Sequence, residues 1–420
     1  MSQKIILQNR NLCKYIFLFI LFAGVGANAV TLETAIENAK KESNEFKKLE
    51  SDVGSVNVSK VIAVENFLLP SVSLNETRFE LNDKDIESNK TNSQTLEVTY
   101  SISNLYKGSL FGMSGIYDLN SQNSLLNAGK NNIILEVIDV YFDTLKAEKK
   151  ITLYKKSLDL NEQILKQTET NAKLGSAKNT TLYLAQSQYE EAKANLELAF
   201  NEFEVVKNKF ILKVGMEPRN LVEPVQTELT FKTLDELTSQ SEKRNFQIQS
   251  TKNQRTASKY NLSGSVSDFL PDISVKYERY REHDSLVDTE YSGNRVTINA
   301  KFYLYKPGIV SSVVQKSYDY HSSKNNHDFT VLYVKNTAQE LWSKKEYYAV
   351  ILPSKQKIVN IREQLVNEWK TDYTYGRIDL THLLDEERKL VEAELDLLQI
   401  KFESLKNIYQ IKNISGERLF

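Results

Sequence analysis

The chain repeats itself with a period of about 201 residues. Turn-forming residues recur at this distance as three pairs: Pro70 and Pro271, Gly175 and Gly376, and Gly215 and Gly416. The residues around them agree in kind, since Phe-Leu-Leu-Pro ends at the first proline and Phe-Leu-Pro ends at the second. A period this long indicates a duplicated unit of domain size, because solenoid repeats are only about 20 to 50 residues long. The two halves are therefore predicted to be equivalent parts of one architecture.

The first 29 residues have the order of a secretory signal peptide. Basic residues precede an apolar stretch over residues 15–25, and the small residues Ala27-Asn28-Ala29 follow it. An uncleaved membrane anchor is the alternative, but the apolar stretch is shorter than the roughly 20 residues that a spanning helix needs. The mature chain is predicted to begin near Val30. Cys13 is the one cysteine, so the mature chain has none.

Composition argues against several classes of function. Without cysteine there is no disulfide framework and no thiolate chemistry. The formal net charge is −1 with 26% charged residues of both signs interspersed, so no basic stripe points to nucleic acid. His321 and His327 are six apart and miss the spacing of a metal-binding helix pair, and no phosphate or dinucleotide loop is present. We expect no enzyme activity and no cofactor, and we expect the adjacent Glu386 and Glu387 to be solvated.

Turn-forming residues divide the mature chain into two repeats with the same plan. The first repeat is predicted over 30–215, a linker over 216–232, the second repeat over 233–416 and a tail over 417–420. Each repeat reads as a helix, a strand pair (about 68–105 and 269–305) and a long helix hairpin that turns at Gly175 or Gly376. Helices are predicted over about 32–66, 109–172, 177–214, 234–266, 309–373 and 378–415. The two longest would each extend roughly 95 Å.

The helix after Gly175 carries a coiled-coil seam. Apolar residues follow one another in alternating steps of three and four: Leu182, Ala185, Tyr189, Ala192, Leu196, Ala199, Phe203, Val206 and Phe210. The helix after Gly376 has Glu386 and Ser404 in its seam, which predicts a partly polar contact. General packing in a helical bundle is the alternative, although it would give a broader stripe. Pro353 is expected to kink or interrupt the second long helix.

The strand regions alternate between apolar and polar residues. The clearest example runs from Val296 to Leu304, with apolar residues at the even positions. Polar connecting stretches over 82–93 and 282–293 are expected to be loops. A hairpin on a soluble protein would alternate in the same way. Four strands of about ten residues suit a tilted membrane-spanning strand, but four cannot close a barrel and lipid does not tolerate open edges, so a spanning sheet requires an oligomer.

Several short motifs lie along the chain: the opening residues 31–39 (Thr-Leu-Glu-Thr-Ala-Ile-Glu-Asn-Ala), the Leu-Pro before each first strand, and Lys173-Leu174-Gly175 with Leu182, Ala185-Gln186, Ala192 and Gly215. Through these motifs the chain resembles, over nearly its whole mature length, the TolC family of outer-membrane efflux and secretion channels. It implies a membrane α/β fold: a homotrimer whose protomers each give four strands to a twelve-stranded outer-membrane β-barrel, continued by a long periplasmic α-helical coiled-coil tunnel.

The same resemblance implies a function. Such a channel is the outer-membrane exit duct of a tripartite efflux or type I protein secretion system, with most of the chain in the periplasm. Its expected partners are outer-membrane lipid, a periplasmic adaptor (membrane fusion protein) and an inner-membrane ABC exporter or proton-driven pump, with no nucleic acid. A secreted or periplasmic coiled-coil structural or adhesive protein without a pore is the alternative.

The resemblance also implies a periplasmic gate, which the chain matches in part. Asp385 and Tyr373 fall on an acidic constriction position and a helix-linking tyrosine position. The other family positions fall on His382, on Ile378 with Arg377 beside it, and on Thr181. Adaptor contacts are implied at the turns, on Gly175, Ser176, Gly376 and Arg377.

Asp385 carries two further expectations that depend on the assembly. Three symmetry-related copies would form a cation-binding ring, and their crowding would raise the pKa of each carboxyl. The alternative is an ordinary solvated helix residue. His382 could add pH sensitivity to the gate, or be a plain surface histidine near a helix start.

Overall fold

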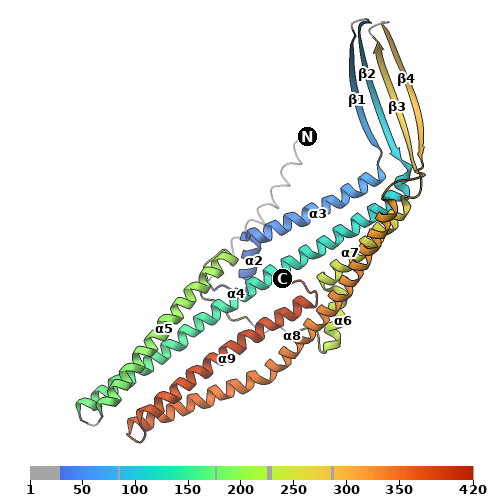
Figure 1. Ribbon diagram of the computed structural model, residues 1–420. Coiled ribbons are helices and arrows are strands. Elements are labelled where there is room, and N and C mark those ends of the chain that lie inside the picture. Colours follow the sequence, from blue (N-terminus) through green and yellow to red (C-terminus); the bar gives the residue numbers. More distant parts are fainter. Residues whose placement is uncertain (1–28, 84–85, 176, 225–228, 285–287, 420) are drawn as a thin grey trace, which may run out of the picture. The chain divides into compact units, whose positions relative to one another are not determined.

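A computed structural model describes residues 29–83, 86–175, 177–224, 229–284 and 288–419 (Figure 1). Its elements follow the same order twice. The first set is α2 (Leu32–Glu42), α3 (Asn44–Leu68), β1 (Ser71–Asp83), β2 (Ile86–Ser101), the 3₁₀ helix η1 (Ile102–Leu105), α4 (Lys107–Lys173) and α5 (Asn179–Val214). The second set is α6 (Leu234–Arg244), α7 (Phe246–Ser267), β3 (Asp272–Asp284), β4 (Thr289–Lys301), α8 (Ile309–Thr374) and α9 (Leu380–Ile414). The expected signal peptide lies outside the described residues, except for Ala29.

The chain forms two compact units. Unit 1 comprises Val137–Gln226, Lys355–Phe402 and the chain up to Ser43, and unit 2 comprises Asn44–Glu136, Thr227–Ser354 and Glu403–Phe420. Each unit therefore contains segments of both sequence repeats. The long helices α4 and α8 each contribute residues to both units.

Unit 2 contains one antiparallel sheet with the strand order β1-β2-β3-β4. Val72 lies opposite Val98, Val98 opposite Tyr277 and Tyr277 opposite Val296. Because side chains alternate along a strand, these four residues share one face. Within the described part of the chain β1 and β4 are the edge strands, and the ladder gives neither a second neighbour.

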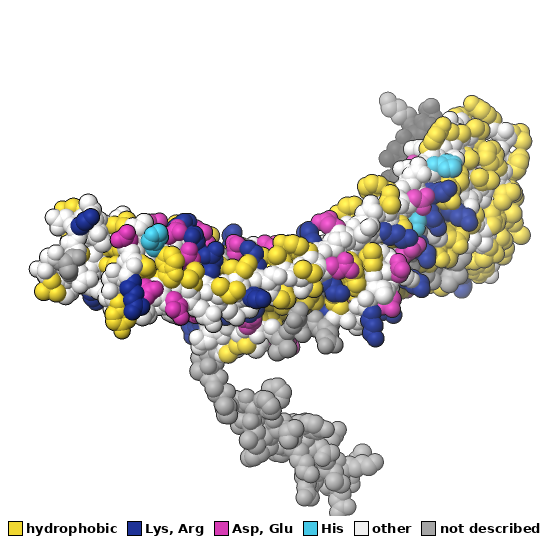
Figure 2. All heavy atoms as spheres, turned by 90° about the horizontal axis from the view of Figure 1, so that it is seen from below, with side chains coloured by type: hydrophobic (Ala, Val, Ile, Leu, Met, Phe, Trp, Pro, Cys, Tyr) yellow, Lys and Arg dark blue, Asp and Glu magenta, His cyan; other side chains and the backbone are white. Residues whose placement is uncertain are grey.

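The face that carries Val72 and Val296 is apolar and exposed. Its large side chains have exposed fractions of 64% for Val72, 74% for Leu74, 66% for Val296 and 70% for Ile298. Figure 2 shows hydrophobic side chains gathered at the part of unit 2 that carries the sheet. We call these residues, with Leu96, Val98, Val275 and Tyr277 on the same face, the apolar band. The apolar band is a contiguous exposed surface, whereas hydrophobic residues on the surface of a soluble protein are usually scattered singly.

The strands extend further into the connecting stretches than the sequence predicts, and they end earlier near the helices, because β2 ends at Ser101 before η1 and β4 ends at Lys301. The polar stretches 82–93 and 282–293 were expected to be loops, but β2 begins at Ile86 and β4 at Thr289. Backbone pairing continues between Phe79 and Thr91 and between Glu282 and Tyr291. The loop prediction is therefore wrong for most of both stretches. Polar residues can occupy a strand because the ladder uses backbone groups, which every residue except proline supplies.

The first helix of each repeat is broken, where the sequence predicts it to be continuous. Ser43 has ψ 119° and Asn245 has ψ 129°, both far from helical values. The Asn245 side chain accepts hydrogen bonds from the backbone N–H of Gln247 (2.9 Å) and Ile248 (3.3 Å), so it caps α7. Its Nδ2 donates to the carbonyl of Ile414 at 3.0 Å. The second break is thus held by a contact distant in sequence.

These breaks explain why Gly215 and Gly416 recur. Both have left-handed backbones, with φ +81° and +80°. A Cβ at Gly215 would lie 2.8 Å from the Cβ of Glu42, the last residue of α2. A Cβ at Gly416 would clash with the carbonyl of Arg244, the last residue of α6. Each glycine therefore lets the end of the final helix of its repeat approach the end of the broken helix.

The two long helices are continuous. α4 has 67 residues and α8 has 66, which at 1.5 Å per residue is about 100 Å each. α8 runs through Pro353, so the expected interruption does not occur. Proline removes one backbone hydrogen bond, and the many turns on either side keep the helix formed.

The core of unit 1 is aromatic where α4, α5 and α9 meet. Tyr141, Phe142, Phe210 and Phe402 are each no more than 2% exposed, with the rings of Phe142 and Phe402 5.8 Å apart. The Tyr141 hydroxyl contacts the carbonyls of Val30 (2.9 Å) and Val222 (2.5 Å). It thereby ties the segment before α2 and the segment after α5 to the core.

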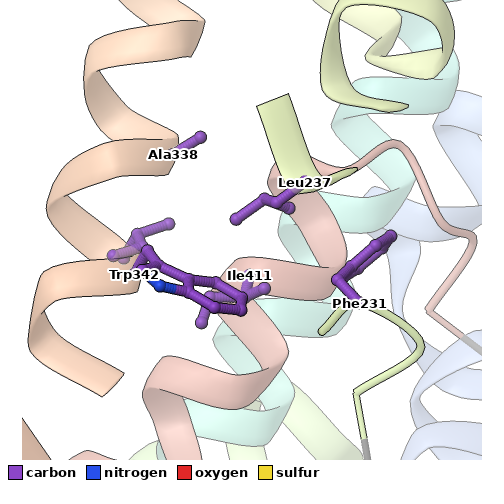
Figure 3. Close-up of a cluster of buried hydrophobic side chains, with 6 residues drawn as sticks. Phe231, Leu237, Ala338, Trp342 and Ile411 are labelled. Carbon is purple, nitrogen blue, oxygen red and sulfur yellow. The ribbon is translucent and has the colours of Figure 1, made fainter. Parts of the chain in front are cut away.

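The core of unit 2 includes a cluster that joins α6, α8 and α9 (Figure 3). It consists of Phe231, Leu237, Ala338, Leu341, Trp342 and Ile411. Leu237 and Ile411 are fully buried, and burying a side chain of this size contributes about 1.5–3 kcal/mol. This cluster packs the short helix α6 against α8 and α9.

Candidate functional site

The two long helix hairpins reverse direction at glycines in the left-handed region. Gly175 has φ +76° and Gly376 has φ +67°. At the second turn, the N–H of Gly376 donates to Tyr373 O (3.0 Å) and that of Arg377 to Asp372 O (2.9 Å), which is the Schellman pattern of a helix end. Apart from the neighbours in sequence, no described residue has a heavy atom within 4 Å of a Cβ built on either glycine. The backbone angle, not a lack of space, therefore requires glycine at both turns. Ser176, expected to contact the adaptor, lies outside the described residues.

The predicted seam packs the hairpin of unit 1. Every seam position of α5 is buried or half-buried, from Leu182 to Phe210. Leu196 and Ala199 pack against Ile151 of α4, and Lys150 of α4 forms an ion pair with Glu202 of α5 at 2.6 Å. Figure 1 shows α5 running beside α4, and α9 beside α8.

A hydrophobic cluster lies close to the turns. It contains Leu380, Leu383 and Leu384 from the start of α9, Ile164 from α4 and Ala185 from α5. Tyr373, Trp369 and Ile378 pack against it. The cluster therefore brings the ends of both hairpins together within unit 1.

Tyr373 links α8 to α4 by a hydrogen bond. Its hydroxyl lies 2.8 Å from the Oγ1 of Thr168, which is fully buried. The Thr168 hydroxyl already donates to the carbonyl of Ile164 at 2.8 Å. A hydroxyl has one proton to donate, so Tyr373 is the donor of the bond between the two helices.

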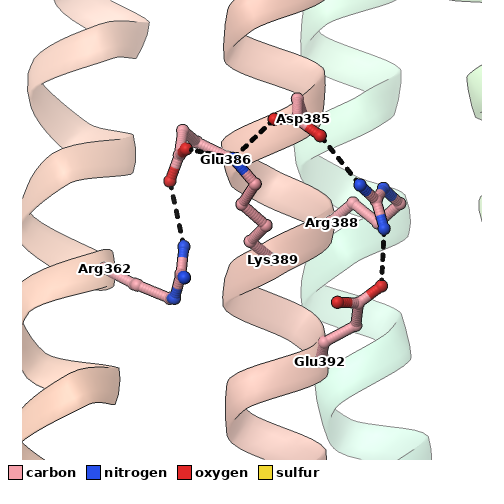
Figure 4. A network of polar contacts seen from close by, with 6 residues as sticks. All are labelled: Arg362, Asp385, Glu386, Arg388, Lys389 and Glu392. Carbon is pink, nitrogen blue, oxygen red and sulfur yellow. Dashed lines mark hydrogen bonds and ion pairs between the residues drawn. The ribbon is translucent and has the colours of Figure 1, made fainter.

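Asp385 belongs to a chain of ion pairs on α9 (Figure 4). It contacts Arg388 at 2.8 Å and Lys389 at 2.6 Å. Hydrogen bonds from Lys389 and Arg388 lower the pKa of the Asp385 carboxyl, which is opposite in direction to the effect expected from crowding in a ring. Within one chain, Asp385 is a carboxylate whose charge is locally offset by two cations.

The same network explains the polar position in the second seam. Glu386 is only 8% exposed, and it contacts Arg362 of α8 at 3.1 Å and Lys389 at 2.8 Å. A buried carboxylate needs such partners to offset its lost hydration. The expectation that Glu386 is solvated is therefore wrong. Its place in the heptad seam was the signal that should have indicated burial.

Glu387 is also buried, and it has no cationic partner in the described ranges. It is 3% exposed, and it accepts a hydrogen bond from the Ser157 hydroxyl of α4 at 2.5 Å. Burial raises the pKa of the Glu387 carboxyl, and the negative charge of Glu191 adds to the shift. Asn161, 2% exposed, lies beside it with an Oδ1 that has no hydrogen-bond partner. The prediction that Glu387 is solvated is wrong as well.

The remaining predicted gate residues lie near the turns. His382 is exposed and packs edge-to-face on Trp369 of α8, with ring centres 5.6 Å apart. Arg377 contacts Asp372 at 3.1 Å and lies over the ring of Tyr375. Thr181 is half-buried in the first turn of α5, where its N–H donates to Lys178 O at 3.0 Å. None of these contacts tests a gating role, which remains a prediction.

The sheet face opposite the apolar band carries a ladder of ion pairs. Lys276 contacts Glu97 at 3.0 Å and Glu278 at 2.8 Å, and Arg295 contacts the same Glu278 at 3.1 Å. The sheet thus has one exposed apolar face and one charged face across the same strands. This two-sided pattern is what a strand between lipid and an aqueous interior requires.

The described residues contain neither a helical membrane span nor a cluster of metal-binding side chains. Among the described residues, no helix combines the length and the apolar character that crossing a membrane requires. No group of three or more histidine, cysteine or acidic residues in the described part of the chain could hold a metal ion.

Comparison with known proteins rests on structure, since no family model and no curated protein sequence matches the chain. Solved structures match over nearly its whole length. The CusC structure, whose report concerns transmembrane channel formation, has a TM-score of 0.81 at 13% identity over 94% of this chain and 96% of that one. The outer membrane protein VceC of Vibrio cholerae has a TM-score of 0.81 at 13% identity over 92% and 96%.

The CmeC outer membrane channel of Campylobacter jejuni has a TM-score of 0.79 at 15% identity over 93% of this chain and 87% of that one. The chain has the fold of these outer-membrane channels. The fold expected from the resemblance to the TolC family is confirmed for the single chain, with four antiparallel strands and long helical hairpins. The outer-membrane channel fold also accounts for the coexistence of a short sheet with helices of more than 60 residues.

Proposed function

We propose that the chain is one protomer of a trimeric outer-membrane channel that passively conducts substrates out of the cell. The observation that carries the proposal is the sheet. Its apolar band is exposed, its opposite face is charged, and its edge strands β1 and β4 lack a second neighbour in the ladder. In lipid such edges would leave backbone groups without hydrogen-bond partners. Three copies supply twelve strands, which suffices to close a barrel.

The helices give the channel its second part. At about 100 Å each, α4 and α8 are long enough to extend a tunnel far into the periplasm, where most of the chain would lie. Gly175 and Gly376 place the hairpin turns at the ends of these helices. In this proposal the turns, with Ser176 and Arg377, contact a periplasmic adaptor. An inner-membrane ABC exporter or proton-driven pump supplies the substrate, as in efflux and type I secretion systems.

The gate is proposed at the cluster beside the turns. Tyr373, His382, Arg377, Thr181 and Asp385 all lie within or next to it. The Tyr373–Thr168 hydrogen bond holds α8 against α4. Asp385 shares Lys389 with Glu386, and Glu386 contacts Arg362 of α8, so the network joins the start of α9 to α8. Opening would require the hairpins to separate at these contacts. A cation ring of three Asp385 carboxylates would form only where the assembly turns them toward one axis.

Mass measurement in detergent tests the proposal. The mature chain, expressed with its signal sequence and extracted from membranes, is expected to have the protein mass of three protomers and to need detergent to remain in solution. A water-soluble monomer would contradict the proposal and favour a secreted or periplasmic structural protein without a pore.

A further inference from the structure

The apolar band ends at two arginines on β3. Alternate residues of a strand share one face, so Arg279 and Arg281 continue the face of Val275 and Tyr277. Arg279 lies opposite Leu96 of β2 and Asn294 of β4, and Arg281 lies opposite Gln94 and Ser292. The side of the sheet that is apolar near the helices therefore becomes polar and cationic one step further along the strands.

Neither arginine has an acidic partner among the residues that the structure describes. Glu76 on this face is paired with Arg78 at 2.8 Å, and Glu278 on the opposite face is paired with Lys276 and Arg295. Glu290 lies two residues from Ser292 on β4, on the same face as Arg281, and forms no ion pair with either arginine among the described contacts. Arg279 and Arg281 are both exposed. The two arginines lie about 7 Å apart along the backbone of one strand, and neither is held in an ion pair with a described residue, so they concentrate positive charge on this part of the face.

The two arginines line a groove of about 420 Å³ on the sheet. Gln94, Ser292 and Asn294 add hydrogen-bond donors to it, and Leu74 and Leu96 form its apolar side. Guanidinium groups bind phosphate through pairs of parallel hydrogen bonds. The groove thus combines the chemistry for a phosphate with direct contact to the apolar band.

We propose that this groove binds the phosphate headgroup of a membrane lipid whose acyl chains lie along the apolar band. A soluble anion would need the arginines and amides but not the leucines that line the same groove, which is why a lipid fits better. The inference rests on the proposed function, because it places the apolar band in a bilayer. It adds that the channel fixes its depth in the membrane by recognising anionic lipid.

Paired lipids test this directly. The purified protein in uncharged detergent is titrated with dioleoyl phosphatidic acid or with dioleoylglycerol, which share acyl chains and differ in the phosphate, and bound lipid is counted by native mass spectrometry. Phosphatidic acid is expected to bind more tightly, and its affinity to fall as salt is added. Arg279→Gln with Arg281→Gln is expected to weaken it at least about tenfold, since a hydrogen bond to a charged group contributes about 1.5–3 kcal/mol.

Two control variants isolate the site. Arg279→Lys with Arg281→Lys keeps both charges and should retain most of the binding. Arg219→Gln with Arg418→Gln removes two arginines outside the sheet and should bind like the unaltered protein. Native masses of all variants report whether they assemble.

Three outcomes would overturn the inference: equal affinity for the two lipids, unaltered binding by the glutamine pair, or equally tight binding of inorganic phosphate, which would assign the groove to a soluble anion. If the same preparation still conducts ions in a bilayer, only the headgroup site is wrong. If the protein neither enters micelles nor conducts, the proposed function is wrong as well.

Discussion

Replacing Glu387 by glutamine should change how the stability of the protein depends on pH. Glu387 is buried between α9 and α4 with a hydroxyl donor from Ser157 and no cation in the described ranges. The pKa of its carboxyl is raised, first by burial and then by the charge of Glu191. Glutamine has nearly the same shape as glutamate but cannot ionise. Its side chain also brings N–H donors to a site where the Asn161 Oδ1 has no hydrogen-bond partner.

The sign follows from proton linkage. The folded protein keeps a proton on Glu387 that the unfolded chain releases, so this group favours folding most below its ordinary pKa of 4.5. As the pH rises through that value, stability declines by about 1.4 kcal/mol per protomer for each pH unit, until the pH reaches the raised folded pKa. Glu387→Gln does not titrate. Its stability should therefore exceed that of the unaltered protein by a margin that grows with pH.

Urea unfolding in detergent, followed by the helical circular dichroism signal, measures this margin between about pH 5 and about pH 8. Glu392→Gln is the matched control, because Glu392 is on the same helix with a side chain 59% exposed and paired with Arg388. The margin of Glu387→Gln should change with pH more than the margin of this control. A margin for Glu387→Gln that stays constant or narrows as pH rises would mean that the folded protein holds Glu387 ionised, and the reasoning would be wrong.

Two further predictions concern the hairpins. Gly376→Ala should lower the unfolding free energy by about 1–2 kcal/mol, because φ at this residue is +67°. The control Gly115→Ala lies inside α4 with open space around its Cβ, and it should raise the unfolding free energy by about 0.5–1 kcal/mol. Equal effects of the two variants in thermal unfolding would contradict this prediction. Arg362→Ala should lower the unfolding free energy by about 1–2 kcal/mol, because it removes one partner of the buried Glu386. The control Lys344→Ala breaks an exposed ion pair and should lower the unfolding free energy by less than about 0.5 kcal/mol. A urea titration in which Lys344→Ala is the more destabilised variant would refute this prediction.

Much of the fold could be predicted from the sequence where the pattern is periodic. The seam from Leu182 to Phe210 is apolar at regular spacing, and the structure buries or half-buries all of it. The alternation over Val296–Leu304 indicated β4, although the strand ends at Lys301, three residues before the alternation does. Gly175 and Gly376 indicated the turns because left-handed backbone favours glycine. These features depend on local sequence, and the sequence alone therefore predicts them.

Features that depend on contacts distant in sequence could not be predicted in this way. The helix breaks occur at Ser43 and Asn245, where no proline or glycine marks them, and the second is held by the carbonyl of Ile414. The burial of Glu386 and Glu387 depends on how α9 packs against α8 and α4. Adjacent glutamates on a charged helix resemble a solvated surface until the neighbouring helices are known.

The central claim, that this chain forms a gated channel, is tested most directly by recording current across a planar lipid bilayer after adding the detergent-purified protein. We expect discrete conductance steps, and larger or more frequent steps from Tyr373→Phe with Asp385→Ala, which removes the hydrogen bond to Thr168 and the contacts of Asp385 with Arg388 and Lys389. An absence of steps from both proteins, although both insert as trimers, would contradict the claim.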